Sequence, residues 1–222
     1  MDSRRRGARD PAEPAERVGL RIIGGSHRGR KLETSGDPRT RPMKDRVREA
    51  VFNLLGPAVA GMHAIDLFAG TGALGLEAIS RGAAQATFFE QHYPTADLIR
   101  RNIGILRVED QTEVIVANTF IWFRKQAARD ELFGRRQPWL IFSSPPYEFY
   151  ASRRDEMLSL IGRLAGAAPA GSILAVEADA RFDFELLPRP PHWDIREYPP
   201  ARVAIGRFDS VIREGEFLPK YL

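Results

Sequence analysis

Residues 65–75, IDLFAGTGALG, constrain the fold more strongly than any other stretch of the chain. A short apolar run ends in a turn that places Gly70, Gly72 and Gly75 at GxGxxG spacing, and good helix formers follow. A strand, a tight turn and a helix in this order bring backbone N–H groups and a helix N-terminus against a polar or anionic cofactor group. The glycines allow unusual φ values and remove side chains that would keep a ligand away. We therefore predict a cofactor site at this turn.

An acidic residue, Glu90, follows Gly70 by about twenty residues, the spacing typical of such sites, and closes a second apolar run at 86–90. A carboxylate at the tip of the second strand suits hydrogen bonding to the two ribose hydroxyls of a nucleoside cofactor. The alternative is an ordinary surface glutamate that closes a strand. The turn, the helix and the acid come in the required order, which favours the ribose-binding interpretation.

From residue 63 onward, the hydrophobic pattern alternates between strand and helix. We predict strands at 63–68, 84–90, 113–117, 139–143 and 173–177, helices over 72–81, 94–106, 119–129 and 153–165, and β-like stretches at 193–198 and 202–212. Ahead of them, residues 20–32 predict a short β-hairpin with a basic edge, and 45–55 predict a helix. This order predicts an α/β fold with a mostly parallel sheet covered by helices on both faces.

Composition narrows the class of protein. A chain of 222 residues suffices for one α/β domain with a sizeable core and a small appendage. The chain has no cysteine, which excludes disulfides and Cys-based metal sites, and we expect no metal. The sequence has no apolar run of membrane-spanning length, and no signal-peptide core near its start. We therefore expect a cytoplasmic monomer without a membrane partner.

Charge is unevenly distributed along the chain. Residues 1–48 carry 14 Lys and Arg against 7 Asp and Glu, a net of +7, and the remainder carries 19 against 22, a net of −3. For residues 1–17, which show no periodic pattern, a solvated disordered tail is favoured. For residues 21–48, contact with a nucleic acid is favoured. We therefore divide the chain into a disordered basic tail (1–18), a nucleic-acid-contacting hairpin and helix (19–57) and a cofactor-binding domain (58–222).

A second motif, Ser143-Ser144-Pro145-Pro146-Tyr147, directly follows the predicted strand at 139–143. In an open α/β sheet, ligands bind beyond the carboxyl ends of the strands, so this loop should lie beside the glycine turn. The prolines stiffen it. A small polar side chain and a backbone carbonyl can accept hydrogen bonds from a planar amine while the aromatic ring stacks on its base. The alternative is a turn that only leaves the strand.

With these motifs, the chain resembles the class I S-adenosylmethionine-dependent methyltransferases, and more closely the bacterial 16S rRNA guanine-N2 methyltransferases. The matching blocks are RIIGGSHRGRKL (21–32), RPMKDRVREAVFNLL (41–55), IDLFAGTGALGLEAISRGA (65–83) and SPPY (144–147). The resemblance implies a Rossmann-like fold, S-adenosylmethionine as cofactor, and ribosomal RNA or a small-subunit particle as partner. A dehydrogenase would leave residues 144–147 and the basic segment unexplained.

The resemblance also implies roles for individual residues. Ser144, Pro145, Pro146 and Tyr147 would hold the acceptor guanine. The cofactor would be bound by Asp66, Phe68, Gly70, Gly72, Glu90, Asn118 and Thr119, with Glu90 at the ribose. Phosphates would be met by Arg21, Arg28, Arg30, Lys31, Arg41, Lys44, Arg46 and Arg48.

Three positions depart from the family's usual pattern. Ser144 stands where the loop usually has Asp or Asn, and a Ser hydroxyl is shorter and a poorer acceptor than a carboxylate. Asn118 stands where an acid usually faces the adenine amino group, although its carbonyl can accept the same bond. Met43 replaces a usual Thr. Two alternatives therefore stay open: a non-catalytic RNA-binding or ribosome-assembly protein, and a methyltransferase for DNA, another RNA or a protein side chain.

Overall fold

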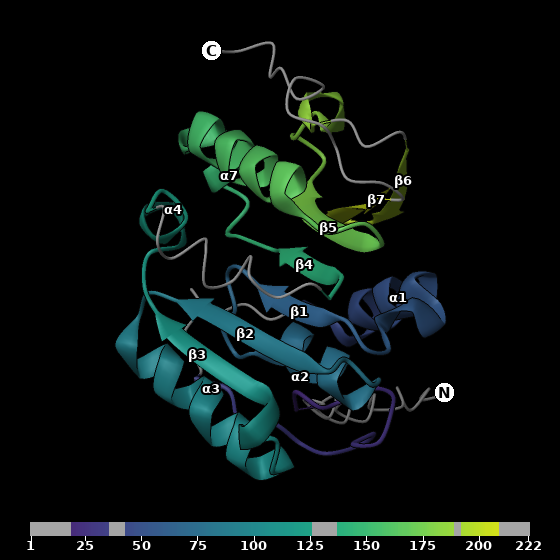
Figure 1. The fold of residues 1–222 in the computed structure, drawn as a ribbon, viewed down its shortest axis with the longest axis vertical. Coiled ribbons are helices and arrows are strands. Elements are labelled where there is room, and N and C mark those ends of the chain that lie inside the picture. Colours follow the sequence, from purple (N-terminus) through teal and green to yellow (C-terminus); the bar gives the residue numbers. More distant parts are fainter. Residues whose placement is uncertain (1–18, 36–42, 126–136, 189–191, 209–222) are drawn as a thin grey trace, which may run out of the picture.

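The computed structural model describes residues 19–35, 43–125, 137–188 and 192–208. Within them, a seven-stranded sheet has the order β3-β2-β1-β4-β5-β7-β6. Its strands are β1 (His63–Asp66), β2 (Gln85–Glu90), β3 (Thr112–Val116), β4 (Trp139–Ser143), β5 (Ser172–Asp179), β6 (Trp193–Tyr198) and β7 (Ala201–Phe208). Strands β1 to β5 are parallel, and β7 runs antiparallel to both of its neighbours. This arrangement confirms the predicted α/β, Rossmann-like fold with a mostly parallel sheet (Figure 1).

The strand order reverses between β1 and β4. The chain moves outward from β1 to β2 and β3, then returns to place β4 on the other side of β1. In parallel sheets, the crevice at such a reversal, beyond the carboxyl ends of the strands, is the usual ligand site. In Figure 1 the arrows of β1, β2 and β4 point toward this edge. Both sequence motifs follow strands that flank the reversal.

The described helices pack on the two faces of the sheet through their buried apolar side chains. They are α1 (Asp45–Leu55), α2 (Ala73–Ser80), α3 (Tyr93–Leu106), α4 (Thr119–Trp122), α6 (Phe149–Ser152) and α7 (Arg154–Ala167), with short 3-10 turns at Gly56–Val59, Glu109–Gln111 and Phe184–Leu186. Side chains of α1, α2 and α3 share one hydrophobic cluster with Ala64. Those of α4, α6 and α7 share a second cluster with the adjacent Ile65, as expected for successive strand residues that face opposite sides. None of the described helices is long and apolar enough to cross a membrane.

The glycine spacing has two structural causes. Gly72 caps the start of α2 with a φ of +79°, a conformation that side chains other than glycine rarely adopt. A Cβ at Gly75 would lie 2.4 Å from the Phe88 ring of β2, so the absence of a side chain lets α2 lie directly on the sheet. The predicted strand, turn and helix are therefore confirmed, and they hold the turn against the sheet edge.

The N-terminal segment differs from its prediction in detail. Instead of a two-stranded hairpin, residues 20–32 form a loop closed by an isolated antiparallel bridge between Arg21 and Lys31. Leu20, Ile22 and Leu32 still turn inward and join the same cluster as α1, so the segment packs on the domain. The predicted helix at 119–129 begins at Thr119 but ends at Trp122, and residues 126–136 lie outside the described part.

Candidate functional site

A pocket lies at the carboxyl edge of the sheet, where β1, β2 and β4 end. Its lining includes six predicted site residues: Phe68, Gly70, Glu90, Asn118, Thr119 and Pro146. Phe89, Gln91, Phe149 and Arg153 also contribute to its wall, and the sequence patterns did not single them out. The remaining predicted residues of the two motifs, Asp66, Gly72, Ser144, Pro145 and Tyr147, are not part of this lining. The fold thus brings the glycine turn and one residue of the Pro-Pro loop to the same pocket.

The Glu90 carboxylate is fixed beside the glycine turn by backbone donors. One oxygen accepts a hydrogen bond from the Gly70 N–H at 3.1 Å, and the other accepts from the His92 N–H at 2.8 Å. A carboxylate oxygen has a second lone-pair site, so each can still accept a hydroxyl proton from a ligand. Two oriented acceptors match the two hydroxyls of a ribose.

Asp66, at the end of β1, is a buried acid next to this pocket. Its side chain is 1% exposed, and neither oxygen has a hydrogen-bond partner of normal geometry among the described residues. Burial raises the pKa of Asp66 to about 7. The nearby backbone N–H groups of Gly75 and Phe68 lower this pKa, but their effect is smaller than that of burial. Such a carboxyl is stabilised by a cation that reaches it.

The residues at this edge fit S-adenosylmethionine. Glu90 presents two acceptors suited to the hydroxyls of the ribose. Asp66, behind the pocket wall, has a carboxylate without a hydrogen-bond partner among the described residues, and its predicted role in cofactor binding stays a prediction. A Cβ on Gly70, where φ is +52°, would meet nothing within 4 Å, so the turn leaves open space on this side. The polar atoms and the space therefore match the chemistry of that cofactor.

Asn118 and Thr119 shape the pocket wall through structural bonds. The Asn118 side-chain oxygen accepts from the Ile121 N–H at 3.2 Å and caps α4, while its NH₂ donates to Gln91 at 2.9 Å. The Thr119 hydroxyl donates to the Leu67 carbonyl at 2.7 Å. The Asn118 carbonyl keeps one lone pair, so its predicted contact with an adenine stays a prediction.

The Pro-Pro loop leaves β4 directly beside β1. The Leu67 N–H donates to the Phe142 carbonyl at 3.0 Å, which ties the starts of both ligand loops together. Pro145 is buried and Pro146 exposed, while Ser144 and Tyr147 are half-buried. The loop is thus held at the same sheet edge as the glycine turn, as predicted.

The sequence did not predict a role for Glu177, whose side chain contacts the Pro-Pro loop. It lies near the end of β5, which pairs with β4, and its side chain accepts hydrogen bonds from the hydroxyls of Ser144 and Tyr147. The Tyr147 hydroxyl lies 2.7 Å from Glu177 Oε1. The available signal was the same as for Glu90, an acid that follows an apolar run on a predicted parallel strand.

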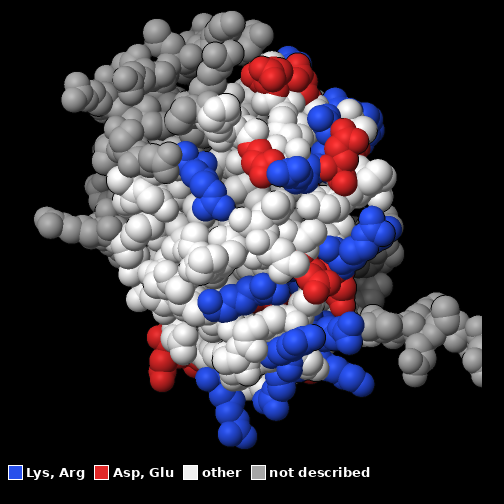
Figure 2. Space-filling model, turned by 90° about the vertical axis from the view of Figure 1, so that its right-hand side faces the viewer, with Lys and Arg blue, Asp and Glu red and all other residues white. Residues whose placement is uncertain are grey.

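The predicted phosphate-binding residues gather at a different edge. Arg21, Arg28, Arg30, Lys31, Lys44 and Arg46 are exposed, and Arg41 lies outside the described residues. The turn at 24–29 packs on the last residue of α2, where the Ser26 N–H donates to the Ser80 carbonyl at 2.7 Å. Because α2 runs from the glycine turn back along the sheet, its end lies at the amino edge of the strands, away from the pocket. Figure 2 shows Lys and Arg predominating over Asp and Glu in the lower part of one face, where Figure 1 places this segment.

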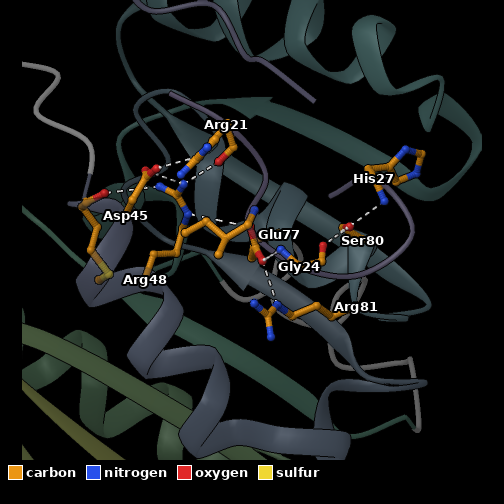
Figure 3. Close-up of polar contacts among 10 residues, drawn as sticks. Arg21, Gly24, His27, Asp45, Arg48, Glu77, Ser80 and Arg81 are labelled. Carbon is orange, nitrogen blue, oxygen red and sulfur yellow. Dashed lines mark hydrogen bonds and ion pairs between the residues drawn. The ribbon is translucent and has the colours of Figure 1, made fainter. Parts of the chain in front are cut away.

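Arg48 corrects the sequence prediction, because it is fully buried and cannot meet a phosphate. Its guanidinium donates to the Arg21 carbonyl at 2.6 Å and to Asp45 at 3.0 Å, and its Nε lies 3.8 Å from Glu77 (Figure 3). Burial lowers the pKa of Arg48, while Asp45 and Glu77 raise it. In the sequence, Val47, Val51 and Leu55 recur at helical spacing, and a charged residue beside them would ordinarily face water. The N-terminal segment, residues 20–32, covers the side of α1 that carries Arg48, and the sequence did not predict this contact.

Glu77 and Ser80 of α2 fasten the N-terminal segment to the domain. The Glu77 carboxylate accepts from the N–H groups of Ile23 and Gly24, each at 2.8 Å, and from Arg81 at 2.7 Å. The Ser80 hydroxyl accepts from the His27 N–H at 2.9 Å (Figure 3). This cluster of polar contacts holds the basic segment in place.

Comparisons with known proteins agree with this geometry. The sequence profile of the family "Conserved hypothetical protein 95" matches residues 20–195. The chain is 37% identical over 189 residues to "Ribosomal RNA small subunit methyltransferase D" of Escherichia coli K12, which covers 83% of this chain and 87% of that protein. It is 34% identical over 142 residues to the protein of the same name from Haemophilus influenzae, covering 64% and 70%. A solved Escherichia coli structure described as a "putative methyltransferase" superimposes with a TM-score of 0.64 at 28% identity, covering 86% of this chain and 99% of that one.

Proposed function

The chain belongs to the Conserved hypothetical protein 95 family, and from this premise we propose that it is an S-adenosylmethionine-dependent methyltransferase of small-subunit ribosomal RNA. The proposed acceptor is the exocyclic N2 amine of a guanine. The relatives' names support ribosomal RNA as the substrate class, and the guanine N2 position is our own proposal, drawn from the motif resemblance. The fold supports methyl transfer as the reaction, because this chain shares its fold with a structure described as a methyltransferase.

One observation carries the proposal: a single pocket is lined by Gly70 and Glu90 of the cofactor turn and by Pro146 of the Pro-Pro loop. A methyl donor and its acceptor must lie in contact for the transfer to occur, and holding them so removes much of the entropic barrier. Two motifs separated by more than fifty residues meet at the reversal of the strand order, where such a reaction requires them.

Methyl transfer from an activated donor requires the protein mainly to position the donor and the acceptor. When bound, S-adenosylmethionine supplies an activated methyl on a sulfonium, which is a good leaving group. Glu90 orients the ribose and Asp66 faces the amino group. The Ser144 oxygen and the Pro145 carbonyl accept the N–H groups of the guanine amine, and the Tyr147 ring stacks on the base. Because the amine must enter a pocket at the sheet edge, the target guanine is unpaired or flipped out of its helix.

The RNA would extend from this pocket to the basic segment at the other edge of the molecule. Exposed side chains of Arg28, Arg30 and Lys31 are available there, although Arg30 also donates to the Ile105 carbonyl at 2.9 Å. Contact at both edges requires a folded RNA or a particle of some size, which agrees with a ribosomal substrate better than with a short oligonucleotide. Phosphate contacts of this kind position the RNA without reading its sequence.

Transfer of labelled methyl from S-adenosylmethionine tests the proposal. The purified chain is incubated with naked small-subunit RNA and, separately, with small-subunit particles from a strain that lacks the protein. We expect label at one guanine, mapped by nuclease digestion and mass spectrometry. No incorporation into either substrate would favour the alternative of a non-catalytic assembly protein. Label on another base or on a ribosomal protein would reject guanine N2.

A further inference from the structure

We infer that Glu177 is a positioning residue of the acceptor site, which acts through the hydroxyls of Ser144 and Tyr147 to orient the amine and to receive its proton. The inference deepens the proposed function and rests on it. It depends on a side-chain cluster outside the pocket lining: one carboxylate on β5 bonded to two hydroxyls of the Pro-Pro loop.

The cluster has the geometry of an ionised acceptor. Ser144 Oγ donates to Glu177 Oε2, and the Tyr147 hydroxyl donates to Oε1 at 2.7 Å. The Glu177 side chain is buried, at 7% exposure, and within the described residues no ion pair joins it to a Lys or Arg. A carboxylate that is not neutralised by a cation and is shielded from water retains its capacity to accept a proton.

This arrangement makes Ser144 a better acceptor than an isolated serine. When a hydroxyl donates its proton to a carboxylate, its oxygen becomes more negative and accepts a further hydrogen bond more strongly. The remaining lone pairs of Ser144 Oγ are available to the guanine amine. The carboxylate also fixes Tyr147, because a ring whose hydroxyl is bonded at one end presents a constant face for stacking.

The proton of the reaction has a defined route. As the amine nitrogen forms its bond to the methyl carbon, the bond from that carbon to sulfur breaks, and its electron pair leaves with the thioether. The nitrogen becomes positive and gives one proton to Ser144 Oγ, while the original Ser144 proton passes to Glu177 Oε2. The serine ends neutral, and the carboxylate ends as a carboxylic acid that later releases its proton to solvent.

Tyr150 is a further titratable group whose pKa responds to the charge of Glu177. The Tyr150 hydroxyl, on α6, lies 3.5 Å from Ser143 Oγ. Burial raises the pKa of Tyr150 above its ordinary range, and the Glu177 charge raises it further, so this hydroxyl stays protonated at neutral pH. The proton acceptor of the cluster is therefore the carboxylate.

The test compares Glu177→Gln, which keeps the shape but removes the charge, with Glu148→Gln, an exposed acid on the same loop. Single-turnover rates are measured between pH 5 and 9 at saturating cofactor, on the RNA or particle that wild type methylates. We expect Glu177→Gln to be slower than wild type by about 10- to 100-fold across this pH range, the scale of a lost hydrogen bond to a charged group. Glu148→Gln should match wild type. Calorimetry with S-adenosylhomocysteine should give equal affinity for all three proteins.

A double-mutant cycle separates this role from a purely structural one. If Glu177 acts through Ser144, Ser144→Ala alone lowers the rate, and adding Glu177→Gln lowers it further only by the part that acts through Tyr147, so the combined loss stays well below the product of the two single losses. Multiplicative losses would overturn the relay, as would a wild-type rate in either single variant. If Glu177→Gln fails to fold, a wild-type rate in Ser144→Ala still refutes the inference. Absence of turnover in wild type would instead reject the proposed function, and this inference with it.

Discussion

Replacing Glu77 with glutamine is expected to destabilise the whole fold, because this side chain holds three donors inside the protein. Its carboxylate accepts from the backbone N–H groups of Ile23 and Gly24 at 2.8 Å and from Arg81 at 2.7 Å. Its side chain is 0% exposed, as is that of Arg48, whose Nε lies 3.8 Å away. Water therefore cannot substitute for the lost charge.

The magnitude follows from what glutamine can and cannot replace. Its carbonyl oxygen can accept from one or two of the donors, but its NH₂ group then faces another donor, and the Arg48 charge loses a partner. Breaking a buried ion pair by removing one charge costs about 3–5 kcal/mol. For a chain of this length, each kcal/mol corresponds to about 2–4 °C in Tm, so we expect Tm to fall by about 6–20 °C.

Urea unfolding, followed by tryptophan fluorescence and far-UV circular dichroism, measures this loss. Glu49→Gln, at an exposed position of α1, is the matched control and should change the free energy of unfolding by less than about 0.5 kcal/mol. Hydrogen exchange locates the effect, since the Ile23 and Gly24 amides should lose protection in Glu77→Gln. A loss below about 1 kcal/mol with unchanged exchange at both amides would show that the carboxylate does not hold this segment.

Three further predictions concern binding and pH. Glu90→Ala should weaken S-adenosylmethionine binding by about 1–3 kcal/mol in calorimetry, and wild-type affinity would reject the ribose-binding role. Replacing Arg28, Arg30 and Lys31 together with alanine should preserve cofactor binding. The slope of log K for RNA binding against log salt should become shallower by up to about three times the contribution of a single phosphate contact, and an unchanged slope would place the RNA surface elsewhere. Because burial raises the pKa of Asp66 to about 7, its stabilising contribution is complete below its ordinary value near 4 and is lost as pH rises toward 7. Asp66→Asn should remove this decline, at most about 4 kcal/mol, from pH-dependent unfolding of the ligand-free protein, and an unchanged decline would contradict the assignment.

Local patterns were enough to predict the order of the elements. The strands predicted at 84–90 and 139–143 span Gln85–Glu90 and Trp139–Ser143 in the structure, and the helix predicted at 94–106 spans Tyr93–Leu106. These segments were predictable because apolar periodicity and turn residues act over a few neighbouring positions. The hairpin expected at 20–32 was less accurate, since its single bridge depends on packing against α2 and α3.

The sequence by itself determined the cofactor turn, because Gly72 and Gly75 are required by backbone conformation and by contact with the next strand. It also determined that Glu90 and the Pro-Pro loop would lie at one edge of the sheet, since parallel strands end on the same side. Only the tertiary structure decided the partners of individual charges. Arg48 is buried because a distant segment covers it, and Glu177 reaches Ser144 because β5 pairs with β4. Both contacts join residues far apart in the chain, and no local pattern encodes which side chains meet across such a distance.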